Sequence, residues 1–429
     1  MRAISEAAGW IRVRLREVAA SDFARKVAET MATRVALLGI GLVTSVLIAR
    51  SLGPAGRGLQ ATVAAITALG VQFGNLGLHS SNTYYVAKDK RLLPVLVGNS
   101  MLVGLGVGSI ICLAVAAAIA VRPDISPLAP TLLALALAGV PIGLSYLLLQ
   151  NLLLGVGEVR AYNTIELVMR IVMVLVLAVL IVGKRVSVEG VALVGLAVSA
   201  ISGWWALARL RRHLNAKVTV ALPILRQHLS YGVKAYFSAL FAYTVLRADI
   251  LMCKYILGAE PTGQYSIAAS MADLVYMLPV VAGTIMFPRL SATADAADRW
   301  MKAKRAAKWM GVLLVGLALL AGLLAAPAVR LLYGDAFLPA VPAFLWLLPG
   351  IVALGVNAIL MNYFASEGMP AVAVWSPALA SLVNIGLNLW LLPQMGIQGA
   401  GVASSLAYCS MLMFSLAYLR SRQSRRDNA

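Results

Sequence analysis

The sequence predicts an all-helical integral membrane protein with about twelve transmembrane helices in two parallel six-helix repeats. Hydrophobic residues make up 61% of the 429 residues and charged residues only 12%, whereas a soluble domain is about half apolar and about a quarter charged. The net charge of +19 lies mostly in short segments between long apolar runs. A protein of this composition has lipid as its main solvent.

Apolar runs long enough to cross a bilayer recur along the whole chain. A spanning helix needs about 20 mostly apolar residues. The candidate spans cover residues 32–51, 58–78, 95–120, 129–152, 164–182, 189–209, 230–256, 263–287, 309–328, 340–364, 371–392 and 398–419. The second and the seventh are the least apolar, because they contain polar residues.

Three short motifs occur in the same order in both halves. Residues 52–58 and 257–263 are turns of equal length, residues 151–157 match residues 362–368, and residues 188–190 match residues 397–399. Parallel repeats of this kind place the substrate site between the halves. We therefore expect an N-lobe at residues 31–210, a cytoplasmic linker at residues 211–228 and a C-lobe at residues 229–420.

The positions of Lys and Arg predict the orientation. With both termini in the cytoplasm, the cytoplasmic segments hold roughly four times as many Lys and Arg residues as the opposite side, as the positive-inside rule requires. We expect a multi-pass protein of the bacterial inner membrane. Residues 1–30 are predicted to form a basic amphipathic segment on the membrane surface, with a frayed charged leader as the alternative, and residues 421–429 form a basic tail.

The sequence lacks the patterns of common catalytic and metal sites. The three cysteines form no CxxC motif, and the three histidines share no metal-ligand spacing. No Walker motif, catalytic triad or paired-carboxylate site occurs. The basic residues belong to no soluble domain that could bind nucleic acid. We therefore expect no enzymatic activity, no cofactor, no metal and no nucleic-acid partner.

The seventh span carries the most informative polar residues. Two phenols and two cations share one helical face: Tyr236, Tyr243, Arg247 and Lys254. Such a face is costly against lipid, so we expect it to face the cleft and to bind substrate. Asp249 points away from Arg247 and should have a partner on a neighbouring helix. The alternative for Arg247 is a structural ion pair, for example with Asp273.

Other polar residues within the spans are candidates for substrate binding: Gln72, Asn75, His79, Arg34, Arg170 and Lys234. The first three follow helical spacing in the second span, where interhelical hydrogen bonding is the alternative. Glu166 and Arg170 are four residues apart in the order that favours an ion pair within the helix, which we favour over a binding role. Asn384 and Asn388 resemble an interhelical polar seam. Asp249 and Asp273 are the candidates for ion coupling.

Several of these positions belong to motifs that resemble those of bacterial polysaccharide flippases of the Wzx type. The motifs are Tyr243-xxx-Arg247-x-Asp249, Leu257-Gly258, Gly263-x-Tyr265-xx-Ala268, Pro279, Phe287-Pro288-Arg289-Leu290 and, in the first half, Ala49-Arg50-x-Leu52-Gly53-Pro54-x-Gly56-x-Gly58. The resemblance extends over essentially the whole chain in length, helix count and repeat. Of the candidate residues, it supports Arg247 and Asp249.

The resemblance implies a V-shaped, two-lobed fold shared with multidrug and toxin extruders (the MATE family) and with the lipid II flippase. It also implies export of an undecaprenyl-pyrophosphate-linked oligosaccharide, such as an O-antigen, capsule or exopolysaccharide repeat unit, by alternating access. The partners implied are the lipid-linked substrate, the bilayer, a polysaccharide polymerase and a chain-length regulator.

Four other functions compete with this interpretation. A multidrug or cation antiporter of the same fold would need acidic residues in its cleft. The lipid II flippase usually has two further helices. An intramembrane polymerase or glycosyltransferase would need a larger external site, and the fourth alternative is a scaffold for a glycan assembly complex that transports nothing.

Overall fold

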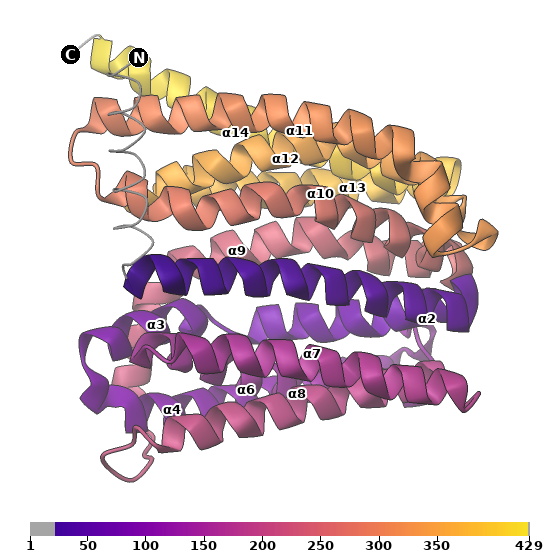
Figure 1. The fold of residues 1–429 in the computed structure, drawn as a ribbon, viewed down its shortest axis with the longest axis horizontal. Helices are drawn as coiled ribbons and strands as arrows, with labels where there is room; N and C mark the ends of the chain where they lie inside the picture. Colours follow the sequence, from indigo (N-terminus) through magenta and orange to yellow (C-terminus); the bar gives the residue numbers. More distant parts are fainter. Residues whose placement is uncertain (1–21, 428–429) are drawn as a thin grey trace, which may run out of the picture.

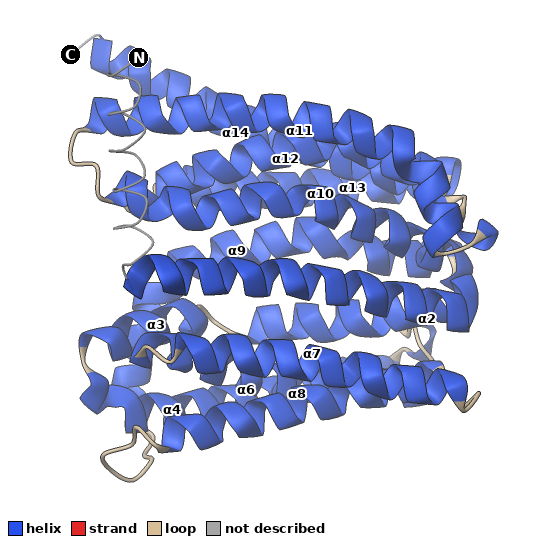
Figure 2. Cartoon of the chain, viewed as in Figure 1, coloured by secondary structure: helices blue, strands red, loops and turns tan. Residues whose placement is uncertain are grey.

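The computed structural model describes residues 22–427, in which every regular element is a helix (Figures 1 and 2). The expected amphipathic segment at residues 1–30 lies mostly outside this range. The first half contains α2 (Asp22–Gly74), α3 (Leu78–Lys88), α4 (Leu93–Met101), α5 (Gly108–Val121), α6 (Pro130–Val156), α7 (Val159–Val182) and α8 (Val188–Arg211). The second half contains α9 (Leu222–Leu257), α10 (Ala259–Ser291), α11 (Ala296–Leu332), α12 (Ala340–Ser366), α13 (Val372–Met395) and α14 (Ile397–Asp427).

The long helix α2 is two spans joined by a tight turn. Gly53 has φ 66° inside it, a left-handed conformation that glycine adopts without steric cost, and Pro54 follows directly. By length and composition, 10 helices of the described chain can cross a membrane, with α2 counted once and α9 left out. The two arms of α2 and the 36-residue α9 bring this to about twelve crossings, which confirms the predicted fold class.

The helices form two lobes, which Figure 1 shows one above the other. Helices α2 to α8 form the N-lobe and α9 to α14 the C-lobe. The largest apolar cluster is mainly in the C-lobe, where Phe344 and Phe364 are fully buried. A separate N-lobe cluster is built around Leu152 and Leu153. Each lobe thus has a core of its own, although Ala49, Ala61 and Ala65 of the N-lobe pack into the C-lobe cluster.

The turns of the two repeats meet where the lobes touch. We call this end of the molecule the hairpin end. A Cβ atom added to Gly58 would lie 1.8 Å from the carbonyl oxygen of Ala259, and one added to Gly263 would lie 1.8 Å from that of Pro54. The contact is reciprocal, because Pro54 and Gly58 occupy the places of Ala259 and Gly263 in the matched turns. Only glycine at both positions allows this approach.

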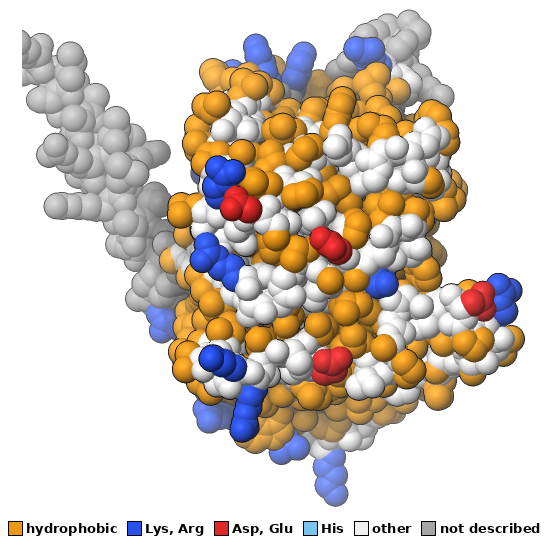
Figure 3. Space-filling model, turned by 90° about the vertical axis from the view of Figure 1, so that its right-hand side faces the viewer, with side chains coloured by type: hydrophobic (Ala, Val, Ile, Leu, Met, Phe, Trp, Pro, Cys, Tyr) orange, Lys and Arg blue, Asp and Glu red, His pale blue; other side chains and the backbone are white. Residues whose placement is uncertain are grey.

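A buried arginine crosses the same contact. Arg57 donates from Nε to Ser266 Oγ of the C-lobe at 3.1 Å and from Nη1 to Gln60 Oε1 at 2.7 Å. It lies beside Gly58 and therefore reinforces the closed hairpin end. The surface at this end is largely apolar, and its charged side chains are scattered rather than gathered into a patch (Figure 3).

The opposite end, which carries both described chain ends, holds the linker between the lobes. Helix α8 ends at Arg211 and α9 begins at Leu222, so the last residues of the expected linker are helical. Asn99 fixes the linker to the N-lobe, because its side chain exchanges two hydrogen bonds with the backbone of Ala221, at 3.0 and 3.2 Å. The ring of His228 stacks on that of Tyr85 with centroids 3.9 Å apart. The start of α9 is thus attached to the N-lobe, although the helix continues into the C-lobe.

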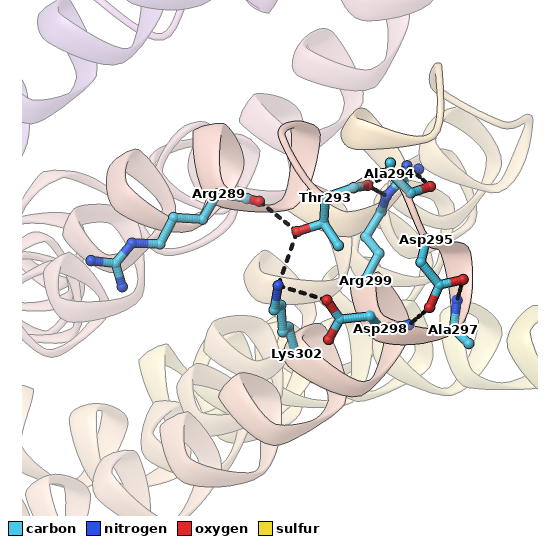
Figure 4. A network of polar contacts seen from close by, with 8 residues as sticks. All are labelled: Arg289, Thr293, Ala294, Asp295, Ala297, Asp298, Arg299 and Lys302. Atoms are coloured by element: carbon cyan, nitrogen blue, oxygen red, sulfur yellow. Dashed lines mark hydrogen bonds and ion pairs between the residues drawn. The ribbon is translucent and has the colours of Figure 1, made fainter.

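At the same end, α10 and α11 are joined by a short polar loop (Figure 4). Asp295 caps α11 by accepting hydrogen bonds from the backbone N–H groups of Ala297 and Asp298. Arg299 donates from Nη2 to the carbonyl oxygen of Thr293 at 2.7 Å. Capping satisfies backbone groups that a helix end leaves free, so α11 can begin right after α10 ends.

Candidate functional site

Two large cavities are found, one in each lobe, and their linings share equivalent positions on α6 and α12. The N-lobe cavity, of about 620 Å³, lies between α2, α6, α7 and α8. The C-lobe cavity, of about 650 Å³, lies between α9, α10, α12 and the start of α13. Tyr146 and Gln150 of the first correspond to Asn357 and Met361 of the second, in the register that matches residues 151–157 with 362–368.

Helix α9 borders both cavities. Tyr243 is the C-lobe residue that lines the N-lobe cavity, whereas Ala242 and Leu246 line the C-lobe cavity. The two spaces therefore lie on either side of one helix, at the boundary between the lobes.

The N-lobe cavity is more polar than the C-lobe cavity and carries both signs of charge. The hydrogen-bonding groups that four N-lobe helices contribute are Gln60, Thr67, Gln72, Tyr146, Gln150, Glu166, Arg170, Ser199 and Ser202. Glu166 and Arg170 form no ion pair with each other in the described part of the chain, which corrects the predicted pairing within the helix. Both side chains line the cavity instead. Buried Oε2 of Glu166 has no hydrogen-bond partner there.

The C-lobe cavity is mainly apolar. Three methionines line it, Met361, Met369 and Met411, together with Phe287 and Leu354. Methionine is flexible and polarisable and adapts to irregular apolar ligands. Its polar lining residues include His79, Ser238, Asn357 and Asn362. Asn357 is fully buried, and its side-chain amide has no partner among the described residues.

The second span is interrupted, and this changes the predicted polar stripe. Helix α2 ends at Gly74 and α3 starts at Leu78, with Leu76 at φ 50° and Gly77 at φ 80° between them. Gln72, before the break, lines the N-lobe cavity, whereas His79, after it, lines the C-lobe cavity. The prediction of one continuous face was wrong, because it assumed an unbroken helix.

Asn75 lies in the break itself. Its Oδ1 accepts from the backbone N–H of Gly77 at 2.8 Å and contacts Nδ1 of His79 at 2.8 Å. The residue is fully buried. Asn75 therefore has a structural role in the turn. This agrees with the hydrogen-bonding alternative to substrate binding that the sequence left open.

The four residues of the predicted α9 stripe do not share one environment. Tyr236 donates its hydroxyl to the carbonyl oxygen of Phe73 in the N-lobe at 2.9 Å. Arg247 donates to Asp273 Oδ2 of α10 at 2.8 Å, the pair that the sequence left as an alternative. Lys254 lies in the last turn of α9 and lines neither cavity. Of this stripe, only Tyr243 faces one of the two cavities.

Asp249 occupies a buried polar site of its own between α9, α10 and α14. Its carboxylate accepts hydrogen bonds from the hydroxyl of Tyr265 and, at 3.2 Å, from Ser404 Oγ. These partners on neighbouring helices confirm the expectation for Asp249. No cationic side chain of the described residues makes an ion pair with it.

The seam of asparagines on α13 continues this site. Asn384 donates to Ser404 Oγ at 3.1 Å, and Asn388 donates to Asn384 Oδ1 at 3.1 Å. Both asparagines are fully buried, and Oδ1 of Asn388 has no partner in the described structure. A carboxylate, a hydroxyl and amide oxygens are the ligands that hard cations prefer. Sequence reasoning missed Ser404, because a serine in an apolar span carries no signal by itself.

The remaining predicted residues lie apart from this site. Arg34, on the first arm of α2, donates from Nη2 to the hydroxyl of Tyr162 at 3.3 Å. Lys234 lies on α9, and the structure does not describe its side chain. Among the described residues, no group of three or more His, Cys, Asp or Glu could hold a metal ion.

Comparisons with known proteins agree with this architecture. The sequence profile of the family described as "Polysaccharide biosynthesis protein" matches residues 23–294, more than half of the chain. An uncharacterised membrane protein of Methanocaldococcus jannaschii is 22% identical over 213 residues, which cover 47% of this chain and 41% of that protein. The chain thus aligns with about two fifths of the length of this curated relative.

Two solved structures share the fold. The inward-facing conformation of a multidrug resistance MATE family transporter of the MOP superfamily superposes with a TM-score of 0.75 at 14% identity, over 91% of this chain and 95% of that one. The lipid II flippase MurJ, in an inward closed conformation, superposes with a TM-score of 0.73 at 14% identity, over 92% of this chain and 87% of that one. Identities this low show the two-lobed fold alone.

Proposed function

The chain belongs to the polysaccharide biosynthesis protein family, and from that premise we propose that it is a flippase for undecaprenyl-pyrophosphate-linked oligosaccharide. It would carry an O-antigen, capsule or exopolysaccharide repeat unit across the bacterial inner membrane by alternating access. A polysaccharide polymerase and a chain-length regulator would act on the product outside.

The observation that carries the proposal is the unequal pair of cavities on either side of α9. A lipid-linked oligosaccharide has a polar head, a charged pyrophosphate and an apolar tail. The more polar N-lobe cavity, which holds Glu166 and Arg170, suits the head, and the more apolar C-lobe cavity with its three methionines suits isoprenoid units next to the pyrophosphate. The rest of the tail would remain in lipid. The reciprocal contact of Gly58 and Gly263 would close the outer side while substrate enters from the cytoplasm.

The pyrophosphate would bind between the cavities at Arg247. Arginine remains charged and matches phosphate oxygens with paired donors. Arg247 is bonded to Asp273 without substrate, so an incoming pyrophosphate would replace the carboxylate. Such an exchange keeps Arg247 paired with an anion in both states, which avoids the cost of an unpaired buried cation, and it releases Asp273, whose side chain is 40% exposed. Arg34, Arg170 and Lys234 remain further candidates for contacts with the pyrophosphate or the sugar.

Ion coupling would reside at Asp249. In the described part of the chain this carboxylate is held by hydroxyl groups and no cation pairs with it, and Oδ1 of the neighbouring Asn388 has no partner there. The surrounding groups fit a small cation such as Na⁺, and a proton on the carboxylate would serve the same role. Asp273 suits this role less well, because Arg247 already neutralises it. No nucleotide is required, and a cation gradient or the membrane potential would drive transport.

A multidrug antiporter is the second candidate, and one observation favours it. The unpartnered carboxylate of Glu166 in the N-lobe cavity would attract a cationic drug. Arg170 lines the same cavity and opposes such binding. Drug efflux without an effect on surface glycan would decide for the antiporter.

Complementation of a flippase-deficient strain tests the proposal at Arg247. Arg247→Ala should lower surface polysaccharide at least about tenfold at equal membrane abundance, since a charge-assisted hydrogen bond contributes about 1.5–3 kcal/mol. Arg122→Ala is the matched control, because Arg122 is exposed and pairs with Asp124 at the hairpin end.

A double variant separates binding from folding. Arg247→Ala alone leaves Asp273 unpaired, so the Arg247→Ala/Asp273→Ala protein removes the pair together. If that double variant restores wild-type polysaccharide, Arg247 is structural and the proposed pyrophosphate site is wrong.

A further inference from the structure

We infer that the N-lobe cavity is a carbohydrate subsite in which Glu166 and Arg170 bind hydroxyl groups of the sugar nearest the pyrophosphate. The inference rests on the proposed function and adds to it the place, the residues and the chemical class of the recognised group: an uncharged, polyhydroxylated ring.

The first support is the state of Glu166. Its carboxylate lines the cavity, its Oε2 is buried, and no hydrogen bond or ion pair to the described residues satisfies it. A buried charged group without a partner costs free energy. Arg170, one helical turn away, lines the same cavity without pairing to it. Both groups are thus held ready for a ligand that supplies donors to one and acceptors to the other.

The charge balance of the cavity decides the ligand class. A free phosphate would be repelled by Glu166, and a cationic drug would be repelled by Arg170. A neutral polyol offers donors and acceptors at once and suits both. The amides of Gln72 and Gln150 from α2 and α6 also offer both kinds of group, as sugar hydroxyls require.

The walls and the location support the same conclusion. Tyr146 and Tyr243 line the cavity, and aromatic rings supply apolar surface for the C–H faces of a sugar. Its volume of about 620 Å³ lies within the range of about 300–1,000 Å³ typical of small-molecule sites. Tyr243 precedes Arg247 by one helical turn, so a pyrophosphate at Arg247 would place the first sugar beside this cavity.

The C-lobe cavity shows that the polarity is a property of this lobe and not of the fold. At the position of Gln150 the C-lobe has Met361, and at that of Tyr146 it has Asn357. At the first of these positions a thioether stands in place of an amide and cannot donate a hydrogen bond, whereas at the second an amide stands in place of a phenol. The head of the substrate therefore belongs in the N-lobe cavity.

Binding measurements on the purified full-length protein in lipid nanodiscs test the inference. The probes are undecaprenyl pyrophosphate and the same lipid carrying one N-acetylglucosamine or one galactose. Wild-type protein should bind one of the sugar-bearing lipids about tenfold more tightly than the bare lipid, or better, as hydrogen bonds to charged groups provide. Glu166→Gln should reduce this ratio to below about threefold and leave the affinity for the bare lipid within about twofold.

Controls keep the outcome decisive. Glu260→Gln is the matched variant, because Glu260 is an exposed carboxylate in the first turn of α10, and it should keep the wild-type ratio. Gln150→Met tests the same subsite without removing a charge. If Glu166→Gln and Gln150→Met both keep the wild-type ratio, the subsite is wrong.

The failure of this inference and that of the proposed function give different results. Equal affinity of wild-type protein for bare and sugar-bearing lipids would overturn the subsite and leave a pyrophosphate-lipid flippase standing. The absence of binding to any of these lipids, with tight binding of tetraphenylphosphonium that Glu166→Gln abolishes, would overturn both.

Discussion

The two lobes of this protein are alike in backbone and unlike in their cavities. At the hairpin end the repeats are so similar that Gly58 and Gly263 make the same contact in both directions. One cavity is nevertheless lined by Gln150, Glu166 and Arg170 and the other by three methionines. The comparison teaches that the contact between the repeats is the same in both halves, whereas the cavity linings differ. Under the proposed function, each lining would suit a different part of an amphiphilic ligand.

The reciprocal contact gives the largest expected effect. Gly58→Ala and Gly263→Ala should each strongly favour separation of the lobes at the hairpin end, because either Cβ atom would overlap a backbone oxygen of the other lobe. Overpacking costs about 1–3 kcal/mol, which changes a two-state population roughly 5- to 150-fold. Transport should fall in both variants by a similar factor.

Spin labels can measure this separation. Labels at Arg122→Cys and Arg330→Cys, both exposed near the hairpin end, should move apart in both glycine variants. Gly41→Ala is the control, since no atom lies within 4 Å of its added Cβ. Unchanged distances in both variants would contradict the assignment of this contact as a gate.

A substitution of Asp249 should give the next largest effect. It tests a second difference between the lobes, which is the buried carboxylate site of the C-lobe. Asp249→Asn keeps the size of the side chain but removes the charge that a coupling cation needs. Transport into vesicles should fall about tenfold or more and lose its dependence on a Na⁺ or proton gradient. Asp273→Asn should retain that dependence. A wild-type rate that is the same with and without either gradient would contradict coupling at this site.

Much of the fold could be predicted from the sequence, because its signals are local. Gly53 and Gly258 mark the turns, and apolar runs mark the spans. The break at Leu76 was missed although Gly74, Asn75 and Gly77 surround it, because glycine is also frequent inside transmembrane helices and the polar residues fitted a helical spacing. The break is stabilised by Asn75 and by packing against α9, which the sequence does not reveal.

The candidate site was less predictable, because it depends on distant residues. The spacing of Glu166 and Arg170 predicts an ion pair within the helix. In the structure both side chains instead line the cavity that α7 forms with α2, α6 and α8. Asp249 and Ser404 are 155 residues apart, and nothing in either local sequence connects them. The α9 stripe was found by periodicity, which does not tell which neighbour each side chain meets.

The smallest expected effect comes from exchanging one residue between the two cavities. Gln150→Met gives the N-lobe cavity the side chain of its C-lobe counterpart, and Met361→Gln does the reverse. Both changes nearly preserve volume, so thermal stability should shift only slightly. If the cavities divide the amphiphile, Gln150→Met weakens binding of the sugar-bearing lipid about threefold to tenfold, in line with the loss of one neutral hydrogen bond. Met361→Gln should weaken bare and sugar-bearing lipids equally, because it places an amide against the isoprenoid. Measured affinities in which both substitutions change only the sugar-dependent part would mean that the two cavities share one polar ligand, and the division of labour between the lobes would be wrong.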